Sequence, residues 1–293
     1  MKVVDSHHHV WRQADLPWLQ GPSVPRIFGA YDPIKRDYPI KEFLGDIAGS
    51  GVERSVYVQA NWPPDNAEGE VAWVQATADR TGWPHAIVGY ADMTVAEVRP
   101  AFDALAKYPL MRGIRQQFHW HENPQYRFAR SPDLCRDPIV QRNVARLADY
   151  GWTFDLQVFA PQMTAAAELA EACPAVTFVL QHAGMLEDLS DDGRAAWKGG
   201  MRALAKCPDV TSKLSAFGTF LHRNDPAHIA RVLHDTVAIF GERRCLWGSN
   251  FPIEKLWTSY ADLLAAFRRA ASDLTAGAQA EIFERTAARV YRL

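Results

Sequence analysis

Eight short apolar runs alternate along the whole chain with segments in which apolar residues recur at helical spacing. This alternation is the pattern of parallel β/α units. Eight such units in sequence predict an eight-stranded (β/α)₈ barrel, the TIM-like α/β fold. The expected strands are residues 3–10, 54–61, 86–93, 112–119, 153–160, 177–184, 210–217 and 245–252. The expected helices are residues 40–51, 68–82, 95–109, 137–151, 163–174, 195–208, 226–241 and 260–272.

An open, doubly wound sheet is the alternative arrangement of such units. Sheets of that kind that bind dinucleotides carry a glycine-rich fingerprint after a strand, and no expected strand here is followed by one. The chain has 293 residues, which suits a barrel of roughly 250 residues with insertions. No low-complexity linker divides it. We therefore expect residues 1–293 to form a single domain.

Charge and composition restrict the class of partner. The net charge is −2 and no basic run occurs, which argues against nucleic acid. No apolar stretch is long enough to span a bilayer, and the N-terminal residues lack the apolar core of a signal peptide. The four cysteines are scattered without a CxxC pair, so we expect buried thiols. We expect a cytoplasmic protein that binds a small molecule, with neither nucleic acid nor membrane as partner, and we leave a homo-oligomer open.

The first expected strand contains three consecutive histidines in the stretch VVDSHHHVW, residues 3–11. Side chains alternate between the two faces of a strand, so His7 and His9 should share one face, together with Asp5. His8 should point the other way. Two imidazoles on one face can converge on one ion or one substrate. Partly buried histidines satisfied by hydrogen bonds are the competing interpretation.

Polar side chains recur where six of the expected strands end. Active sites of (β/α)₈ barrels lie at the carboxyl ends of the strands, whereas the barrel interior prefers branched apolar residues. The long segments 11–39 and 120–137 follow strands and should lie at the same end. We therefore expect an active site there. Its polar residues are Asp5, His7, His9, Gln59, Asn61, Arg115, Gln117, His119, His182, Lys213, Ser215, Ser249 and Asn250.

Arg115 on the fourth strand indicates the kind of substrate. A guanidinium binds a carboxylate through two parallel hydrogen bonds, so Arg115 is a candidate for holding an acidic group of the ligand. The segment after this strand, QFHWHENPQYRF, adds a second His-x-His pair. We expect substrate contacts from Gln59, Arg115, His119, His121, Tyr126 and Arg127.

Four motifs on strands one, four, six and eight carry a family resemblance. They are DSHHHVW at 5–11, GIR at 113–115, LQHAG at 180–184 and WGSNFP at 247–252. In this order they resemble the amidohydrolase-2 family, in particular its branch of 2-pyrone-4,6-dicarboxylate lactonases and sugar-acid lactonases. The resemblance spans essentially the whole chain. It implies an amidohydrolase-type, distorted (β/α)₈ barrel and hydrolysis of a cyclic ester.

The resemblance also implies a set of catalytic residues. The paired histidines on strand one and the histidine on strand six match at His7, His9 and His182, but Asn250 stands where the family commonly has aspartate. An asparagine cannot act as a base near neutral pH. The catalytic residues expected from the resemblance are therefore His7, His9, His182 and Asn250.

Two questions about this site stay open in the sequence. His7, His9 and His182 could hold one divalent metal, with zinc the first candidate, or the histidines could polarise the ester carbonyl without a metal. The base that activates water would then be His182 or Glu254, although Glu254 could equally form a surface ion pair with Lys255.

The sequence thus predicts an enzyme, a hydrolase that opens a lactone of a carboxylated or polyhydroxylated small molecule. Two other functions compete with it. One is a metal-dependent decarboxylase or another hydrolase of the same superfamily. The other is a relative that has lost catalysis and only binds a small molecule, for which Asn250 is the one supporting feature.

Overall fold

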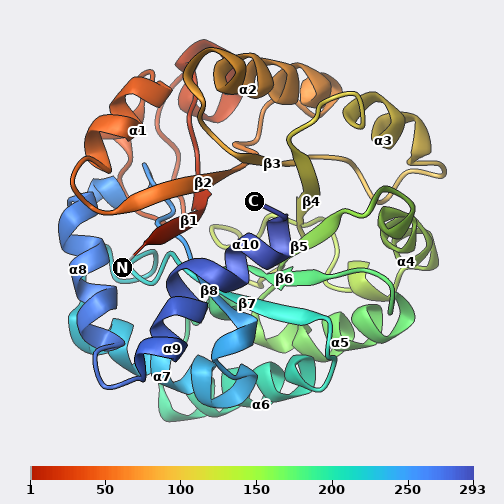
Figure 1. The fold of residues 1–293 in the computed structure, drawn as a ribbon. Helices are drawn as coiled ribbons and strands as arrows, with labels where there is room; N and C mark the ends of the chain where they lie inside the picture. The colour runs from red at the N-terminus through yellow and green to blue at the C-terminus, as the bar shows by residue number, and fades with distance from the viewer. Residues whose placement is uncertain (1) are drawn as a thin grey trace.

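The computed structural model describes residues 2–293 and contains one parallel sheet of eight strands rolled into a barrel (Figure 1). The strands are hydrogen-bonded in sequence order, β1 to β8. An isolated parallel bridge between His8 and Phe251 joins the two ends of the sheet. The strands are β1 (Val3–His8), β2 (Val52–Val58), β3 (Ala86–Gly89), β4 (Met111–Gln117), β5 (Thr153–Gln157), β6 (Phe178–Leu180), β7 (Val210–Leu214) and β8 (Cys245–Trp247).

A helix follows each strand and packs outside the barrel, so that eight helices surround the sheet (Figure 1). The (β/α)₈ barrel predicted from the sequence is therefore confirmed, and each of the expected strands and helices is present. Most are shorter than expected. The helices are α1 (Ile40–Asp46), α2 (Ala67–Thr81), α3 (Arg99–Leu105), α4 (Pro138–Ala145), α5 (Met163–Ala172), α6 (Asp191–Ala205), α7 (Pro226–Phe240) and α8 (Tyr260–Ala270).

Two short helices at the end of the chain were not expected from the sequence. They are α9 (Ala276–Ala280) and α10 (Thr286–Tyr291). Helix α10 lies across the end of the barrel at which the strands begin (Figure 1). Its Ala287 and Tyr291 pack against inward-facing strand residues such as Val4 and Val56. The π-helical turn η11 (Glu281–Arg285) joins α9 to α10 without a break, and its wider turn interrupts the 3.6-residue period that the pattern analysis relies on.

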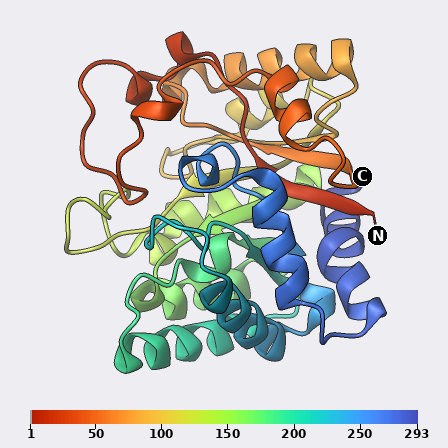
Figure 2. The same ribbon diagram turned by 90° about the vertical axis from the view of Figure 1, so that its left-hand side faces the viewer.

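The opposite end of the barrel carries the two long segments predicted at residues 11–39 and 120–137. Figure 2 shows them on the side of the molecule away from both termini. A pair of backbone hydrogen bonds between Trp11 and Tyr38 closes the base of the first segment. All four cysteines are buried free thiols, as expected. Among residues 2–293, no helix is long and apolar enough to cross a membrane.

Candidate active site

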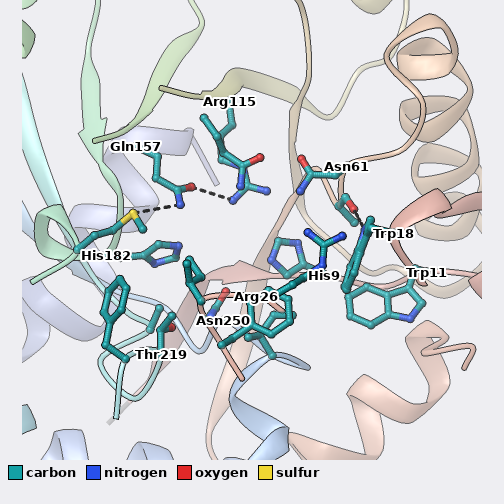
Figure 3. A pocket seen from close by; sticks show the side chains of 18 residues that line it. His9, Trp11, Trp18, Arg26, Asn61, Arg115, Gln157, His182, Thr219 and Asn250 are labelled. Carbon is teal, nitrogen blue, oxygen red and sulfur yellow. Dashed lines mark hydrogen bonds between the residues drawn. The ribbon is translucent and has the colours of Figure 1, made fainter. Parts of the chain in front are cut away.

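A pocket with an empty volume of about 700 Å³, including its opening to solvent, lies at the carboxyl ends of the strands (Figure 3). It is lined by both arginine and histidine side chains but by no aspartate or glutamate. The lining residues are His9, Trp11, Trp18, Arg26, Ile27, Phe28, Ala60, Asn61, Arg115, Gln117, Gln157, His182, Met185, Ala216, Thr219, Phe220, Asn250 and Ile253.

His7 and His9 reach the same region, as the sequence predicted. Their ring centroids are 5.0 Å apart. The Nδ1–H of His9 donates to the carbonyl oxygen of Val58 at 2.6 Å, which leaves His9 Nε2 as a hydrogen-bond acceptor. His7 lies behind the pocket wall, fully buried, and neither of its ring nitrogens has a hydrogen-bond partner within the described part of the chain.

Asp5 does not share the face of His7 and His9, so that part of the prediction is wrong. The register of β1 against β2 shifts between Asp5 and His8, and this irregularity breaks the simple alternation of side chains. The Asp5 carboxylate instead accepts a hydrogen bond from the hydroxyl of Tyr260 in α8 at 2.9 Å. It also accepts from the backbone N–H of Ser249 at 2.8 Å, which ties β1 to the end of β8.

His8 points away from the pocket, as predicted. It stacks on Phe43 of α1, with ring centroids 3.9 Å apart and an angle of 10° between the ring planes. Burial lowers its pKa to about 3, so the ring is neutral and serves as a flat packing surface.

His182 completes the histidine group from the opposite side of the barrel. It follows β6 in a left-handed backbone conformation, with φ of 57°. Its Nδ1 lies 2.8 Å from the hydroxyl oxygen of Ser215, and its ring centroid lies 4.8 Å from that of His7. This contact orients the ring and leaves Nε2 available to a ligand.

All three histidines of the group are uncharged at neutral pH. Burial is the largest cause that lowers the pKa of His7, His9 and His182 well below the usual value. The cations of Arg115 and Lys213 lower the pKa values of His7 and His182 further. The site therefore presents neutral imidazoles beside two buried positive charges.

Arg115 lines the pocket as expected, and no carboxylate of residues 2–293 pairs with it. Its guanidinium donates to the backbone oxygen of Gln59 and, at 3.5 Å, to the side-chain oxygen of Gln157 (Figure 3). Its Nε is buried without a partner. Burial lowers the pKa of Arg115 to about 10. The buried carboxylate of Asp155 is instead bonded to Lys213 at 3.0 Å, beneath the pocket.

Asn250 lines the pocket between β8 and β1, and its backbone N–H donates to the carbonyl of His7 at 2.7 Å. Behind it lies Glu254, whose side chain is fully buried. The surface ion pair considered for Glu254 is therefore wrong. Lys255 pairs with Glu42 and Asp46 at 2.8 and 2.7 Å instead, because it projects from the opposite side of the turn.

The other expected substrate contacts lie outside the pocket lining. The Gln59 amide oxygen accepts from the backbone of Asn61 at 2.7 Å. His119 is buried between Phe128 and Phe159, which lowers its pKa to about 3. The remaining three belong to the second long segment, whose local contacts hold His121, Tyr126 and Arg127.

The position of Arg127 outside the pocket lining has a local cause. Its guanidinium donates to the backbone oxygens of His121 and Glu122, both at 2.9 Å, and lies 4.8 Å from the ring of Trp120. These contacts fold the charge back onto its own loop. The segment braces the pocket instead, since Gln125 donates to the backbone oxygen of Arg26 at 3.0 Å.

Several lining residues were not predicted as site residues. Trp18, Arg26 and Phe28 come from the first long segment, and the Arg26 guanidinium lies 5.4 Å from the ring of Trp18. Their segment was expected at this end, but nothing in its sequence says which side chains turn inward. Gln157 carried a usable signal, because it is polar and ends the fifth strand.

The donor types of the histidine group suit a metal such as zinc. His9 and His182 each engage Nδ1 and keep Nε2 for a ligand, while the His7 nitrogens are buried without partners. As they are placed, however, no three His, Cys, Asp or Glu side chains among residues 2–293 form a group that could hold an ion. The residues therefore fit a metal by chemistry, and coordination would require these side chains to move.

Comparison with known proteins identifies the family. The amidohydrolase family model matches residues 4–293. An uncharacterised protein of Sinorhizobium fredii is 32% identical over 99% of this chain and 98% of its own. An L-fucono-1,5-lactonase of Burkholderia multivorans is 29% identical over 99% of this chain and 96% of its own.

Solved structures give the same result. The crystal structure of an amidohydrolase from Burkholderia multivorans with bound zinc superposes with a TM-score of 0.82 at 27% identity, and the match covers 100% of both chains. The family resemblance inferred from the four motifs is confirmed: the chain belongs to the amidohydrolase family.

Proposed function

We propose that the protein is a hydrolase that opens a lactone bearing a carboxylate or several hydroxyl groups. The observation that carries this proposal is a pocket with neutral histidines, an arginine lacking a carboxylate partner and no acidic side chain in its lining. Such a pocket favours an anionic ligand and stabilises an oxyanion. The name of the L-fucono-1,5-lactonase relative supports a sugar-acid lactone in particular.

Substrate binding uses the two kinds of surface in the pocket. Arg115 takes the carboxylate of an acidic lactone. The amides of Asn61, Gln117 and Gln157 can donate and accept, which suits hydroxyl groups. Trp18 adds a flat apolar wall for a ring.

Hydrolysis requires that water attack the lactone carbonyl and lose a proton. His182 Nε2 takes this proton, while the positive field at the site, to which the buried Lys213 contributes, favours the negative charge that develops on the carbonyl oxygen. The pKa of His182 is low in the free protein, but negative charge beside it in the transition state raises its basicity. The ring C–O bond then breaks, and His182 returns the proton to the departing alkoxide. The product is an open-chain hydroxy acid.

A divalent metal held by His7, His9 and His182 would polarise the carbonyl and lower the pKa of a bound water. The zinc in the structure of the Burkholderia multivorans relative supports this form of the site. The form without a metal uses the same three histidines as neutral polar groups. Both forms place the acid–base chemistry at the same end of the barrel.

The first experiment is hydrolysis of a panel of acidic and neutral sugar-acid lactones by tag-free protein, followed with a pH indicator. Metal content is measured by mass spectrometry before and after chelation. His182→Gln should lower kcat by about 100-fold or more, because it removes the base. The control is His234→Gln, on the outer helix α7. Failure of the wild-type protein to hydrolyse any lactone in the panel, with and without added zinc, would refute the proposed function.

A further inference from the structure

Asp155 is the centre of a buried hydrogen-bonded cluster in the barrel interior, beneath the pocket. It lies in the middle of β5, and its carboxylate is fully buried. Its Oδ1 accepts from the Thr153 hydroxyl at 3.0 Å. Its Oδ2 accepts from Lys213 Nζ at 3.0 Å, from Gln181 Nε2 at 2.9 Å and from the Tyr291 hydroxyl at 2.8 Å. These four donors match the roughly four lone-pair sites of an ionised carboxylate.

Two of these donors are attached to the residues that orient the proposed base, His182. Gln181 directly precedes His182 at the end of β6. Lys213 lies in β7, two residues before Ser215. The Nδ1 of His182 lies 2.8 Å from the Ser215 hydroxyl oxygen. Each side of this contact is therefore within two residues of a side chain that binds Asp155.

The backbone at His182 depends on such restraints. Its φ is 57°, in the left-handed region. That conformation is costly for a residue other than glycine and persists where the surroundings enforce it. Gln181 supplies one restraint, because its Nε2 donates both to Asp155 and to the carbonyl of Val179, at 2.9 and 3.1 Å. Release of Gln181 from Asp155 should therefore let the His182 ring turn away from Ser215.

Tyr291 is the one of the four donors that does not come from β5–β7 or the turn after β6. It ends α10, which lies across the end of the barrel opposite the pocket (Figure 1). Its side chain is fully buried, and its ring centroid lies 5.2 Å from Lys213 Nζ. Burial raises the pKa of the Tyr291 hydroxyl well above its usual value, so the group keeps its proton and donates to Asp155.

We propose that Tyr291 is a positioning residue, which acts through the Asp155 carboxylate to keep the His182 ring in place at the pocket. The path runs from the Tyr291 hydroxyl to Asp155, then to the Gln181 side chain, and along one peptide unit to His182. A parallel connection through Lys213 reaches the partner of the His182 ring. Helix α10 thus acts on the pocket from the opposite end of the barrel. The catalytic consequence rests on the proposed lactone hydrolysis, but the orientation of His182 does not.

NMR of the histidine rings tests the orientation independently of any activity. In protein labelled with ¹⁵N in its histidine rings, the His182 signals are those missing from His182→Gln. The wild-type protein and Tyr291→Phe are compared after chelation, so that no metal on the ring sets its tautomer. Contact with Ser215 should hold the wild-type ring in one neutral tautomer, with well-separated nitrogen shifts. In Tyr291→Phe the two shifts should move toward each other, because a released ring populates both tautomers.

The same spectra contain their own control. The ring signals of His234, on the outer helix α7, should not move in Tyr291→Phe. Unchanged His182 signals in that variant would overturn the proposal, whether or not a lactone is hydrolysed. Displaced His182 signals without lactone turnover in the wild-type protein would refute the proposed function alone.

Kinetics on a hydrolysed lactone then test the positioning role. Tyr291→Phe keeps the ring and its packing and removes only the hydroxyl. It should lower kcat by about 10-fold with KM nearly unchanged, the effect of one lost hydrogen bond on the orientation of the base. The matched control is Tyr150→Phe, since the Tyr150 hydroxyl donates to Asp103 at 2.6 Å on the outside of the barrel. Equal kcat values in Tyr291→Phe and in this control would overturn the proposal.

A double variant tests the path through Gln181. Gln181→Met breaks the connection one link closer to His182 and should also lower kcat by about 10-fold. Because both changes release the same ring, the variant that combines Gln181→Met with Tyr291→Phe should lose clearly less than the roughly 100-fold product expected for independent sites. A loss equal to that product would show that Tyr291 acts by another route and would overturn the proposal.

Discussion

Replacement of Arg115 by glutamine should leave the fold at least as stable while abolishing selectivity for acidic lactones. Arg115 is 4% exposed and carries its charge without a carboxylate partner. A buried charge without a partner lowers the stability of the fold. We therefore expect Arg115 to serve ligand binding rather than stability. Arg115→Gln removes the charge and keeps an amide that can donate one hydrogen bond.

The effect on stability follows from the pKa of the guanidinium. Burial lowers that pKa from 12.5 to about 10, a difference of 2.5. At 1.36 kcal/mol for each pKa unit, keeping the charge in the folded state costs about 3 kcal/mol. The bonds to Gln59 and Gln157 return about 1 kcal/mol each, and glutamine can retain one of them. The free energy of unfolding should therefore rise by about 1 to 2 kcal/mol.

The effect on catalysis has the opposite sign. Two unit charges 4 Å apart attract by about 4 kcal/mol at an effective dielectric constant near 20. Because an amide hydrogen bond replaces about 1 kcal/mol of this attraction, we expect a loss of about 3 kcal/mol, or roughly 100-fold in kcat/KM for an acidic lactone. An uncharged lactone of the same ring should lose less than about 10-fold.

Urea-induced unfolding measures the first effect, and kcat/KM for an acidic lactone and its methyl ester measures the second. Arg112→Gln, on the same strand with its guanidinium bonded to the backbone of Pro109 and Met111, is the matched control. Destabilisation of Arg115→Gln by more than about 3 kcal/mol would show that the charge is compensated in the folded protein. Equal losses on both substrates would show that Arg115 does not recognise a carboxylate.

Two further predictions concern buried carboxyl groups away from the pocket lining. Burial raises the pKa of Glu70 from 4.5 to about 7, so the folded state binds more protons between these values, and this part of the stability is lost as pH rises through 7. The free energy of unfolding of Glu70→Gln, measured with urea, should rise by about 3 kcal/mol relative to that of the wild-type protein as the pH increases from 4 to 8. Asp155→Asn leaves Lys213 as a buried unpaired cation, and thermal unfolding should show a loss of about 3 to 5 kcal/mol, whereas the exposed control Asp209→Asn should show little change.

The barrel could be predicted from the sequence because its signal is local and repeated. Each strand is a short apolar run, and each of the eight outer helices buries one apolar face, so both periods are visible in the residues themselves. The strand ends could be named for the same reason: His9, Arg115, His182 and Asn250 are polar where the barrel pattern expects apolar residues. The direction of the Asp5 side chain could not be predicted, because the shift in register at β1 leaves no mark in the alternation.

The loop contributions could not be predicted, because they depend on contacts between distant segments. Arg26 reaches the pocket only because the first long segment is held by Gln125 and His222, which bond to the backbone of Arg26 and Ile27 at 3.0 and 3.1 Å. Arg127 has the same charge and follows an expected site strand, yet its own loop takes up its hydrogen bonds. Residue type alone does not distinguish the two arginines.

The backbone itself indicates where this fold departs from the most stable local structure. Left-handed backbone angles are costly for most residues other than glycine, and they persist where the surroundings enforce them, often at functional sites. Five of the pocket-lining residues have positive φ, and four of these lie two or three residues beyond the end of β2, β6, β7 or β8. They are Asn61, His182, Met185, Ala216 and Asn250. At Asn250 the residue type agrees with the backbone, since asparagine tolerates this left-handed conformation better than most other residues.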